Sequence, residues 1–328
     1  MTHPTFSAIS RRTLLAAGLG TLAGGAAQAQ AAYPSRPVRL MVGYSAGGGI
    51  DAVARLLGPR LSTVLGQQVV VENRAGASGL IAGDLVAKAA PDGYTLFLGD
   101  SSALIAQHLQ ARMSFDPIKS FVPVAGVFKL PLLIVASNEF PARTPAEFLS
   151  AMKAAPGKYS YATSGVGQVQ HLGFEMLKGR TQSFVVHVPY RGAAQILPDV
   201  ISGLVPLAVV SATAGMAQVK AGRLKAIAVM SPVTLAGAES VPPLSSVLPG
   251  FDAAPRIYVA APAGTPQAVV DRLGAALQSV MSAPDMTQIA AQQGAVPAFM
   301  PATQIAADLR RESEMWEKII REQKITAE

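Results

Sequence analysis

The feature that most constrains the fold is a strand-like run that leads through a glycine-rich loop into a helix-like pattern. Residues 40–42 have the length of a buried strand, and the loop GYSAGGG follows at residues 43–49. Apolar residues then recur at helical spacing as far as Leu65, and we predict that Asp51 is the N-cap of this helix. Strands that alternate with helices in this way are typical of an α/β fold.

This first loop predicts a binding site for an anion. The first turn of a helix presents free backbone N–H groups, and the helix dipole adds partial positive charge there. Three consecutive glycines allow a ligand to approach the main chain closely. Because the loop has neither the GxGxxG spacing nor the Gly-Lys-Ser/Thr ending of nucleotide loops, the expected anion is smaller than a nucleotide. The alternative interpretation is a tight strand-to-helix turn without a ligand.

Residues 1–31 have the pattern of an export signal. Arg11 and Arg12 precede a short apolar stretch at residues 14–22, and Ala29-Gln30-Ala31 fits a small-x-small cleavage site. The arginine pair resembles a twin-arginine signal, and the alternative is an ordinary Sec signal. We therefore expect a periplasmic protein.

Charge and residue counts argue against several classes of partner and cofactor. The chain carries a formal charge of +7, but no dense basic cluster is interleaved with aromatic residues, so we predict no nucleic-acid binding. It contains no cysteine, which excludes disulfides and thiolate metal sites. Beyond the signal, His108, His171 and His187 lack the spacing of metal ligands, so no metal and no cofactor are predicted.

The strand–helix alternation continues along the chain and repeats the loop motif. Residues 75–79 form a second glycine-rich loop, and Ser101 and Ser102 follow a third predicted strand. Ligands of parallel sheets lie beyond the carboxyl ends of the strands, so both serines are candidate ligand contacts, with helix capping as the alternative role. Residues 164–167 (SGVG) form another strand-to-helix turn, and this is the second place where N–H groups are expected to meet an anion.

The order of these patterns predicts two lobes. Around residues 121–137 the chain appears as two apolar runs separated by Lys129-Leu130-Pro131, as expected where it leaves one sheet and enters another. We place the return near residues 251–261. The prediction is lobe 1 at residues 33–128 and 257–328 and lobe 2 at residues 129–256, each a mostly parallel sheet flanked by helices.

Several segments together resemble the receptor family of tripartite tricarboxylate transporters, the Bug family of solute-binding proteins. The chain matches at YPSRPVRL from Tyr33, at Gly47-Gly48, Asp51 and Ala54-Arg55, and in VVVENRAGASG and VAKAAPDGYTLFLG within residues 69–99. Further pieces are FDP at residues 115–117, YATSG at 161–165, HVPYRG at 187–192, LPGF at 248–251 and APAGTP at 261–266. These pieces follow the family order from one end of the predicted mature chain to the other.

The resemblance implies a two-lobed, type II-like periplasmic-binding-protein fold with two crossovers. It implies that a small carboxylate lies in the cleft and is held by backbone groups and ordered waters from one loop of each lobe. Carried over by position, the first loop comprises Tyr44, Ser45, Ala46, Gly47, Gly48 and Gly49, with Asp51 beyond it. The second comprises Thr163, Ser164, Gly165 and Gly167. The implied partners are membrane transporter subunits or a sensor protein, and we expect a monomer.

Three further candidates are weighed against plainer roles. His171 lies one turn into the helix after the second loop and is expected either to touch the ligand or to hydrogen-bond the loop. Ser211 stands where family members often have an aspartate, which disfavours an amino-acid ligand. Arg256 replaces a common aromatic residue. It either binds a second carboxylate, as in a di-, tri- or aromatic carboxylate, or forms a salt bridge.

The competing functional class is an exported hydrolase. Ser101, Ser164 or Ser78 would then be the nucleophile, and His171 or His187 the base. The chain contains no Gly-x-Ser-x-Gly elbow, so we favour a binding protein without enzymatic activity.

Overall fold

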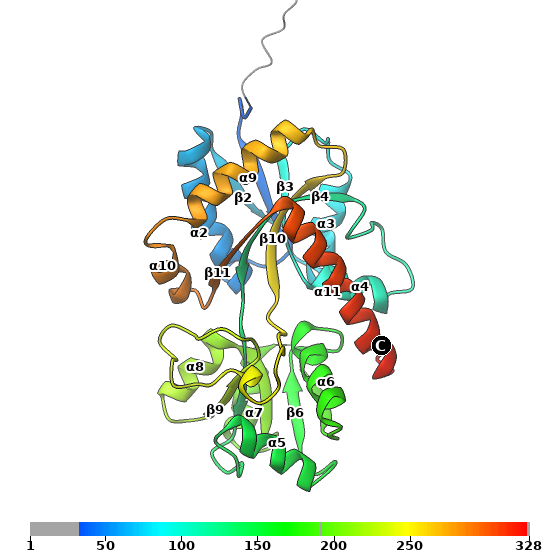
Figure 1. The fold of residues 1–328 in the computed structure, drawn as a ribbon, viewed down its shortest axis with the longest axis vertical. Coiled ribbons are helices and arrows are strands. Elements are labelled where there is room, and N and C mark those ends of the chain that lie inside the picture. Colours follow the sequence, from blue (N-terminus) through cyan, green and yellow to red (C-terminus); the bar gives the residue numbers. More distant parts are fainter. Residues whose placement is uncertain (1–32, 191, 327–328) are drawn as a thin grey trace, which may run out of the picture. The chain divides into compact units, whose positions relative to one another are not determined.

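The computed structural model describes residues 33–190 and 192–326, and the predicted export signal lies outside them. Two sheets flanked by helices form two lobes (Figure 1). The first sheet contains β1 (Val38–Val42), β2 (Val69–Asn73), β3 (Thr95–Asp100), β4 (Phe121–Lys129), β10 (Arg256–Pro262) and β11 (Val296–Pro301). The second contains β5 (Leu132–Ala136), β6 (Ser160–Thr163), β7 (Val186–Pro189), β8 (Leu207–Ser211) and β9 (Lys225–Val229).

Helices flank both sheets. Those of the first lobe are α2 (Gly49–Leu65), α3 (Leu80–Ala87), α4 (Ser102–Leu109), α9 (Gln267–Met281), α10 (Met286–Gln292) and α11 (Ala302–Glu322), with a 3₁₀ turn at Ala77–Gly79. Those of the second lobe are α5 (Pro145–Ala154), α6 (Val169–Thr181), α7 (Ala193–Ile201) and α8 (Ala212–Lys220), with a 3₁₀ turn at Leu244–Ser246.

Both sheets are mixed, so the prediction that they are mostly parallel is wrong. The first sheet has the order β11-β4-β10-β3-β1-β2, and only β2, β1 and β3 are mutually parallel. The second has the order β7-β6-β8-β5-β9, and only β7, β6 and β8 are parallel. One cause is the double crossover: β10 and β5 each enter a sheet from the other lobe and run antiparallel to their neighbours. The edge strand β11 is also antiparallel to its neighbour β4.

The parallel parts of the two sheets share one topology. In each lobe the first parallel strand, β1 or β6, lies between the next two, so the crossover direction reverses beside it. Such a reversal leaves a crevice beyond the carboxyl ends of the strands, where ligands of α/β sheets bind. The predicted loop residues follow β1 and β6, and Ser102 and Ser211 lie at the ends of β3 and β8.

Two connections join the lobes. The chain passes from β4 to β5 through Leu130 and Pro131, and it returns between β9 and β10. The two connections are tied together because the Leu130 N–H donates to the carbonyl of Pro255 at 3.0 Å. The lobe boundaries placed at residues 128/129 and 256/257 stay a prediction.

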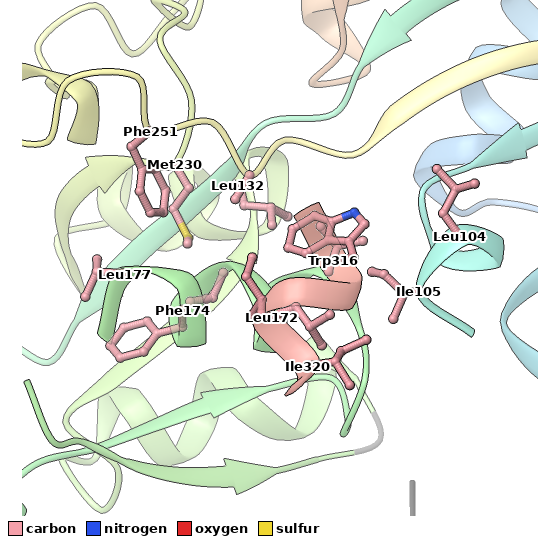
Figure 2. Close-up of a cluster of buried hydrophobic side chains, with 14 of the residues drawn as sticks. Leu104, Ile105, Leu132, Leu172, Phe174, Leu177, Met230, Phe251, Trp316 and Ile320 are labelled. Carbon is pink, nitrogen blue, oxygen red and sulfur yellow. The ribbon is translucent and has the colours of Figure 1, made fainter. Parts of the chain in front are cut away.

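The C-terminal helix α11 joins the apolar cores of both lobes. Trp316 and Ile320 on this helix lie beside Ile105 of α4 and Leu172 of α6 (Figure 2). Trp316 is 1% exposed, and its indole N–H donates to Glu312 at 3.1 Å, so it is a packing residue. In this structure α11 therefore buries apolar surface from both lobes at once.

Candidate functional site

The first loop joins β1 to α2 and exposes main-chain amides. Residues 45–49 are exposed, and Gly47 has φ +86°, a conformation that strongly favours glycine. Gly48 is the N-cap of α2, with extended backbone angles, and no side chain caps the helix. The first turn of α2 therefore presents N–H groups that a ligand can use.

Asp51 is not the N-cap, which corrects the sequence prediction. It lies inside the first turn of α2 and is 2% exposed. Its carboxylate accepts hydrogen bonds at 2.8 Å from the Gly47 N–H, from Arg55 Nε and from Asn73 Nδ2. Because Asn73 also donates to the carbonyl of Tyr44, Asp51 and Asn73 together fix both ends of the loop. The role of Asp51 is thus to position the loop.

The protonation state of Asp51 follows from these contacts. Burial alone raises the pKa of its carboxyl, but hydrogen bonds from Arg55, Gly47 and Asn73 outweigh burial and hold the pKa below 3.8. The loop is therefore held by an ionised carboxylate at neutral pH.

Tyr44 turns its side chain away from the exposed amides. Its hydroxyl donates to the Asp100 carboxylate at 2.6 Å and lies 3.2 Å from the Ser102 hydroxyl. Burial raises the pKa of Asp100 despite the hydrogen bonds from Tyr44 and Ser102. Burial, together with the neighbouring Asp100, also raises the pKa of Tyr44. These side chains form a buried polar support behind the first loop.

The two predicted serines have different surroundings. Ser101 is fully buried, and its Oγ accepts the backbone N–H of Arg256 at 3.0 Å, so it does not face solvent or a ligand. The N–H of Ser102 donates to the Asp100 carboxylate at 3.0 Å, and Ser102 lines a cavity. The structure therefore keeps only Ser102 as a candidate contact.

The second loop joins β6 to α6 and also leaves a helix without a side-chain cap. Residues 164–168 are half-buried, and the N-cap of α6 is Gln168, whose side chain does not cap the helix. The Thr163 hydroxyl lies 3.4 Å from the Gly165 N–H and 2.7 Å from His187 Nε2. Gly167 has φ +74°, and a Cβ there would lie 2.5 Å from the Leu109 side chain of α4. This position therefore needs glycine.

Two stacked histidines, His171 and His187, hold the second loop. The Gly167 N–H donates to His171 Nδ1 at 3.2 Å, and the rings of His171 and His187 stack with centroids 3.9 Å apart. Burial, reinforced by Lys178, lowers the pKa of His171 to about 4. Burial, with His171 and Lys178, lowers that of His187 to about 3. Both imidazoles are neutral near pH 7, and His171 has the hydrogen-bonding role that the sequence analysis gave as its alternative.

Two other described helices, α5 and α8, are capped by side chains. Thr144 and Glu147 form a complete capping box at α5, and Ser211 caps α8 through the Ala214 N–H at 3.4 Å. Ser211 is exposed and lies at the end of β8, so it is placed beside the crevice but is used by its own helix. Since α3, α4, α7, α9, α10 and α11 also begin without a side-chain cap, the lack of a cap alone does not distinguish α2 and α6. Their position directly after β1 and β6, the strands at which the crossover direction reverses, does.

Arg256 lies in a network of internal ion pairs. It pairs with Asp308, with Glu312 at 3.6 Å and with Asp252 at 3.9 Å. Lys129 Nζ pairs with Asp252 at 2.6 Å. Burial lowers the pKa of Arg256, but the three carboxylates outweigh burial and raise it overall. The structure thus shows the salt-bridge role for Arg256, at the connections between the lobes.

A cavity of about 290 Å³ is lined by both lobes. Its lining includes Ser78, Ser102, Leu109 and Gln110 from the first lobe, and Gly167 and Gln168 from the second. Ser102 and Gly167 are the predicted residues that the structure brings to this cavity. Residues 44–49 do not line it, but the Tyr44 hydroxyl supports its wall through Ser102. The described lining residues carry no charge.

Sequence reasoning missed three polar residues of this wall, Ser78, Gln110 and Gln168. It singles out neither glutamine, and it names Ser78 only as a hydrolase nucleophile. The signal for Ser78 was the Gly76-Ala77-Ser78-Gly79 run, in which all four residues adopt positive φ. Left-handed Ala and Ser are uncommon and point to a constrained loop.

The described residues lack two further kinds of site. In this part of the chain no helix has the length and apolar character needed to cross a bilayer. Across the same residues no three histidine, aspartate or glutamate side chains are grouped so as to hold a metal ion.

Comparisons with known proteins agree with this geometry. The sequence profile of the tripartite tricarboxylate transporter family receptor matches residues 53–325. A UPF0065 protein from the tcbD-tcbE intergenic region of Pseudomonas sp. (strain P51) is 35% identical over 99% of this chain and 98% of its own length. The structure of R. palustris Rpa4515 with adipate is 30% identical, has a TM-score of 0.77 and covers 90% of this chain and 99% of that one. MatC (Rpa3494) from Rhodopseudomonas palustris with bound malate is 28% identical, with a TM-score of 0.71, covering 88% and 100%.

Proposed function

Because this chain belongs to the tripartite tricarboxylate transporter receptor family, we propose that it is a periplasmic receptor that captures a small carboxylate between its lobes. It delivers this ligand to membrane transporter subunits or to a sensor protein. The family consists of periplasmic solute-binding proteins, and the mixed two-sheet fold is that of a two-lobed periplasmic binding protein.

One observation carries the proposal: α2 and α6 both begin in glycine loops at the switch points of their sheets, and neither has a side-chain cap. Uncapped N–H groups and the helix dipoles of both starts favour one carboxylate placed between them. A partly buried charge at a helix N-terminus gains up to about 2 kcal/mol, against about 0.3–1 kcal/mol when exposed. Exclusion of water by the two lobes raises the value of these contacts.

Neutral amides suit a receptor that must also exist empty. A cationic side chain in the crevice would be left unpaired and partly desolvated without ligand, at considerable cost. Arg256, the one arginine that the sequence analysis considers as a ligand contact, is already paired with three carboxylates. We therefore propose main-chain recognition of the first carboxylate, without a contact from Arg256.

The hydrolase alternative finds no support in the histidine contacts. His171 accepts from the Gly167 N–H, and His187 pairs with Thr163. Ser101 bonds the Arg256 N–H and Ser78 bonds Gln168, so among the described residues neither histidine activates these serines. General-base activation of a serine requires such a contact. We propose binding without turnover.

The ligand class follows from the relatives and from the cavity. The similar proteins named above hold adipate and malate, which are both dicarboxylates. A cavity of about 290 Å³ suits an acid of this size. Native mass spectrometry of freshly purified protein identifies the acid that co-purifies.

A proline substitution tests the role of the amides directly. Gly49 is the first residue of α2, and Gly48 before it has ψ 168°, which a following proline favours. Gly49→Pro therefore removes one N–H donor without breaking the helix. We expect calorimetric titration to show adipate affinity about tenfold to a hundredfold lower, the usual value of a hydrogen bond to a charged group.

The matched control is Gln267→Pro, which places proline at the exposed first position of α9. This variant should bind adipate as the wild type does. Equal affinity in all three proteins would contradict the proposed role of the α2 amides.

A further inference from the structure

A side-chain hydrogen bond crosses from one lobe to the other at the cavity. Gln168 Nε2 donates to Ser78 Oγ at 2.9 Å, and both residues line the cavity. Gln168 is the N-cap residue of α6 in the second lobe, and Ser78 lies in the 3₁₀ turn of the first. The polar groups of the two walls therefore meet at this point.

The backbone holds Ser78 in an unusual conformation. Ala77 and Ser78 have φ +47° and +55°, values that side-chain-bearing residues rarely adopt. The turn is pressed against the first loop, because a Cβ on Gly43 would lie only 2.3 Å from the Gly79 Cα. The Tyr44 hydroxyl also lies 3.3 Å from the Ser78 carbonyl. Strain of this kind persists where the surroundings fix a functional position, and it aims the Ser78 hydroxyl at the cavity.

Gln168 is directed to the same place from the other side. An N-cap side chain usually serves its own helix, yet the Gln168 amide crosses the cavity and leaves α6 uncapped. The preceding Gly167 belongs to the second loop and lines the same cavity. The cavity thus begins at a loop that we propose to hold a carboxylate and passes between Gln168 and Ser78.

We propose that Ser78 and Gln168 determine ligand specificity by binding the second carboxylate of an unbranched dicarboxylate. This inference rests on the proposed function, which concerns the first carboxylate. When the second carboxylate enters, the Gln168 amide protons and the Ser78 hydroxyl proton donate to it in place of their mutual bond. Neutral donors suffice for an anion here, as they do at the helix starts.

The mutual bond also explains how an acid with an apolar end is tolerated. If the far end of the ligand is a methyl group, Ser78 and Gln168 remain bonded to each other, so neither is left buried and unpaired. Discrimination therefore comes from the added bonds to the dicarboxylate. We expect adipate to bind about tenfold to a hundredfold more tightly than hexanoate, which has the same chain length.

The decisive variant is Gln168→Glu. The Ser78 hydroxyl can donate to the new carboxylate, so a bond between the two walls survives. The added negative charge, however, faces the second carboxylate of adipate. Calorimetric titration should show adipate affinity at least about tenfold lower and hexanoate affinity within about twofold of the wild-type value. Ser78→Ala removes one donor and should likewise weaken adipate more than hexanoate.

The control is Gln182→Glu, which adds the same charge at the exposed C-cap of α6, a residue that does not line the cavity. It should leave both affinities unchanged. If Gln168→Glu and Ser78→Ala weaken adipate and hexanoate equally, or weaken neither, the specificity role is overturned while carboxylate binding stands. If wild-type protein binds neither acid, nor any other carboxylate in a thermal-shift screen, the proposed function fails and this inference fails with it.

Discussion

The first loop is held by a charged side chain, whereas the second is held by neutral ones. Asp51 fixes the loop before α2 as an ionised carboxylate with partners Gly47, Arg55 and Asn73. His171 fixes the loop before α6 because its neutral imidazole accepts the Gly167 N–H, and its ring stacks on that of His187. Two helix starts that both present main-chain amides are therefore positioned by side chains that respond differently to substitution and to pH.

Asp51→Ala should have the largest effect on folding. It leaves the Gly47 N–H and the Asn73 amide without their acceptor at a part-buried site, and we expect the free energy of unfolding to fall by about 2–3 kcal/mol. Chemical denaturation measures this change. The control is Glu322→Ala, which breaks an exposed ion pair with Lys318 and should change stability by less than about 0.5 kcal/mol. If the two variants had the same free energy of unfolding, Asp51 would contribute no more to stability than a surface ion pair, and its role as the loop anchor would be contradicted.

His171→Leu should have a smaller effect, because it removes one neutral hydrogen bond. The Gly167 N–H loses its acceptor, and we expect a loss of about 1–2 kcal/mol together with weaker adipate binding. In His171→Gln the side-chain oxygen supplies an acceptor again, so part of both losses should be recovered. If the Gln variant is no better than the Leu variant in denaturation and titration, the imidazole does not hold the loop through this bond.

A fall in pH should weaken the support of the second loop before that of the first. The folded pKa of His171 is about 4, below the ordinary value of about 6.5, so the unfolded state binds more protons between these pH values. Stability conferred by the histidines is therefore present above about pH 6.5 and declines as the pH falls, by at most about 1.4 kcal/mol per pH unit for one histidine. The contribution of Asp51 declines only below its ordinary pKa of 3.8.

Amide hydrogen exchange, corrected for intrinsic rates, measures this difference. Between pH 7 and pH 5 protection should fall at Gly167 and stay constant at Gly47, whose N–H bonds Asp51. Parallel loss of protection at both glycines would mean that the loops share one support.

Gly48→Asp should have the smallest effect on folding and should stabilise the protein. Gly48 is the N-cap of α2 and has a backbone that aspartate tolerates, so an added side-chain cap gains about 0.5–1 kcal/mol. The same carboxylate occupies the amides that we assign to the ligand, so adipate affinity should fall although the melting temperature rises. Unchanged affinity would show that these amides are not used for binding.

Much of the fold followed from the sequence because apolar periodicity and turn residues agree along most of the chain. The apolar periodicity after the first glycine loop ends at Leu65, where α2 also ends. The edge strand β11 was missed because Pro297 and Pro301 disfavour a strand, although prolines are tolerated at a sheet edge. The mixed sheets were missed because strand direction depends on the crossovers and not on local pattern.

The candidate site was predicted less completely. The glycine loops were found because a strand, a glycine run and a helix are local signals. Asp51 and Ser101 are buried and bond to Asn73 and Glu312, which are distant in sequence, so local pattern did not reveal their roles. The contact between Gln168 and Ser78 spans 90 residues and belongs to the cavity wall, which only the folded chain defines.

The most direct test of the account is the response of backbone amides to ligand in ¹⁵N-labelled protein. On titration with adipate, the amide protons of Gly49 and Ile50 in α2 and of Val169 and Gln170 in α6 should shift downfield together and saturate at one ligand concentration. Such a joint response shows that amides of both lobes hold one carboxylate. Shifts confined to one lobe, or to residues remote from both loops, would contradict the account.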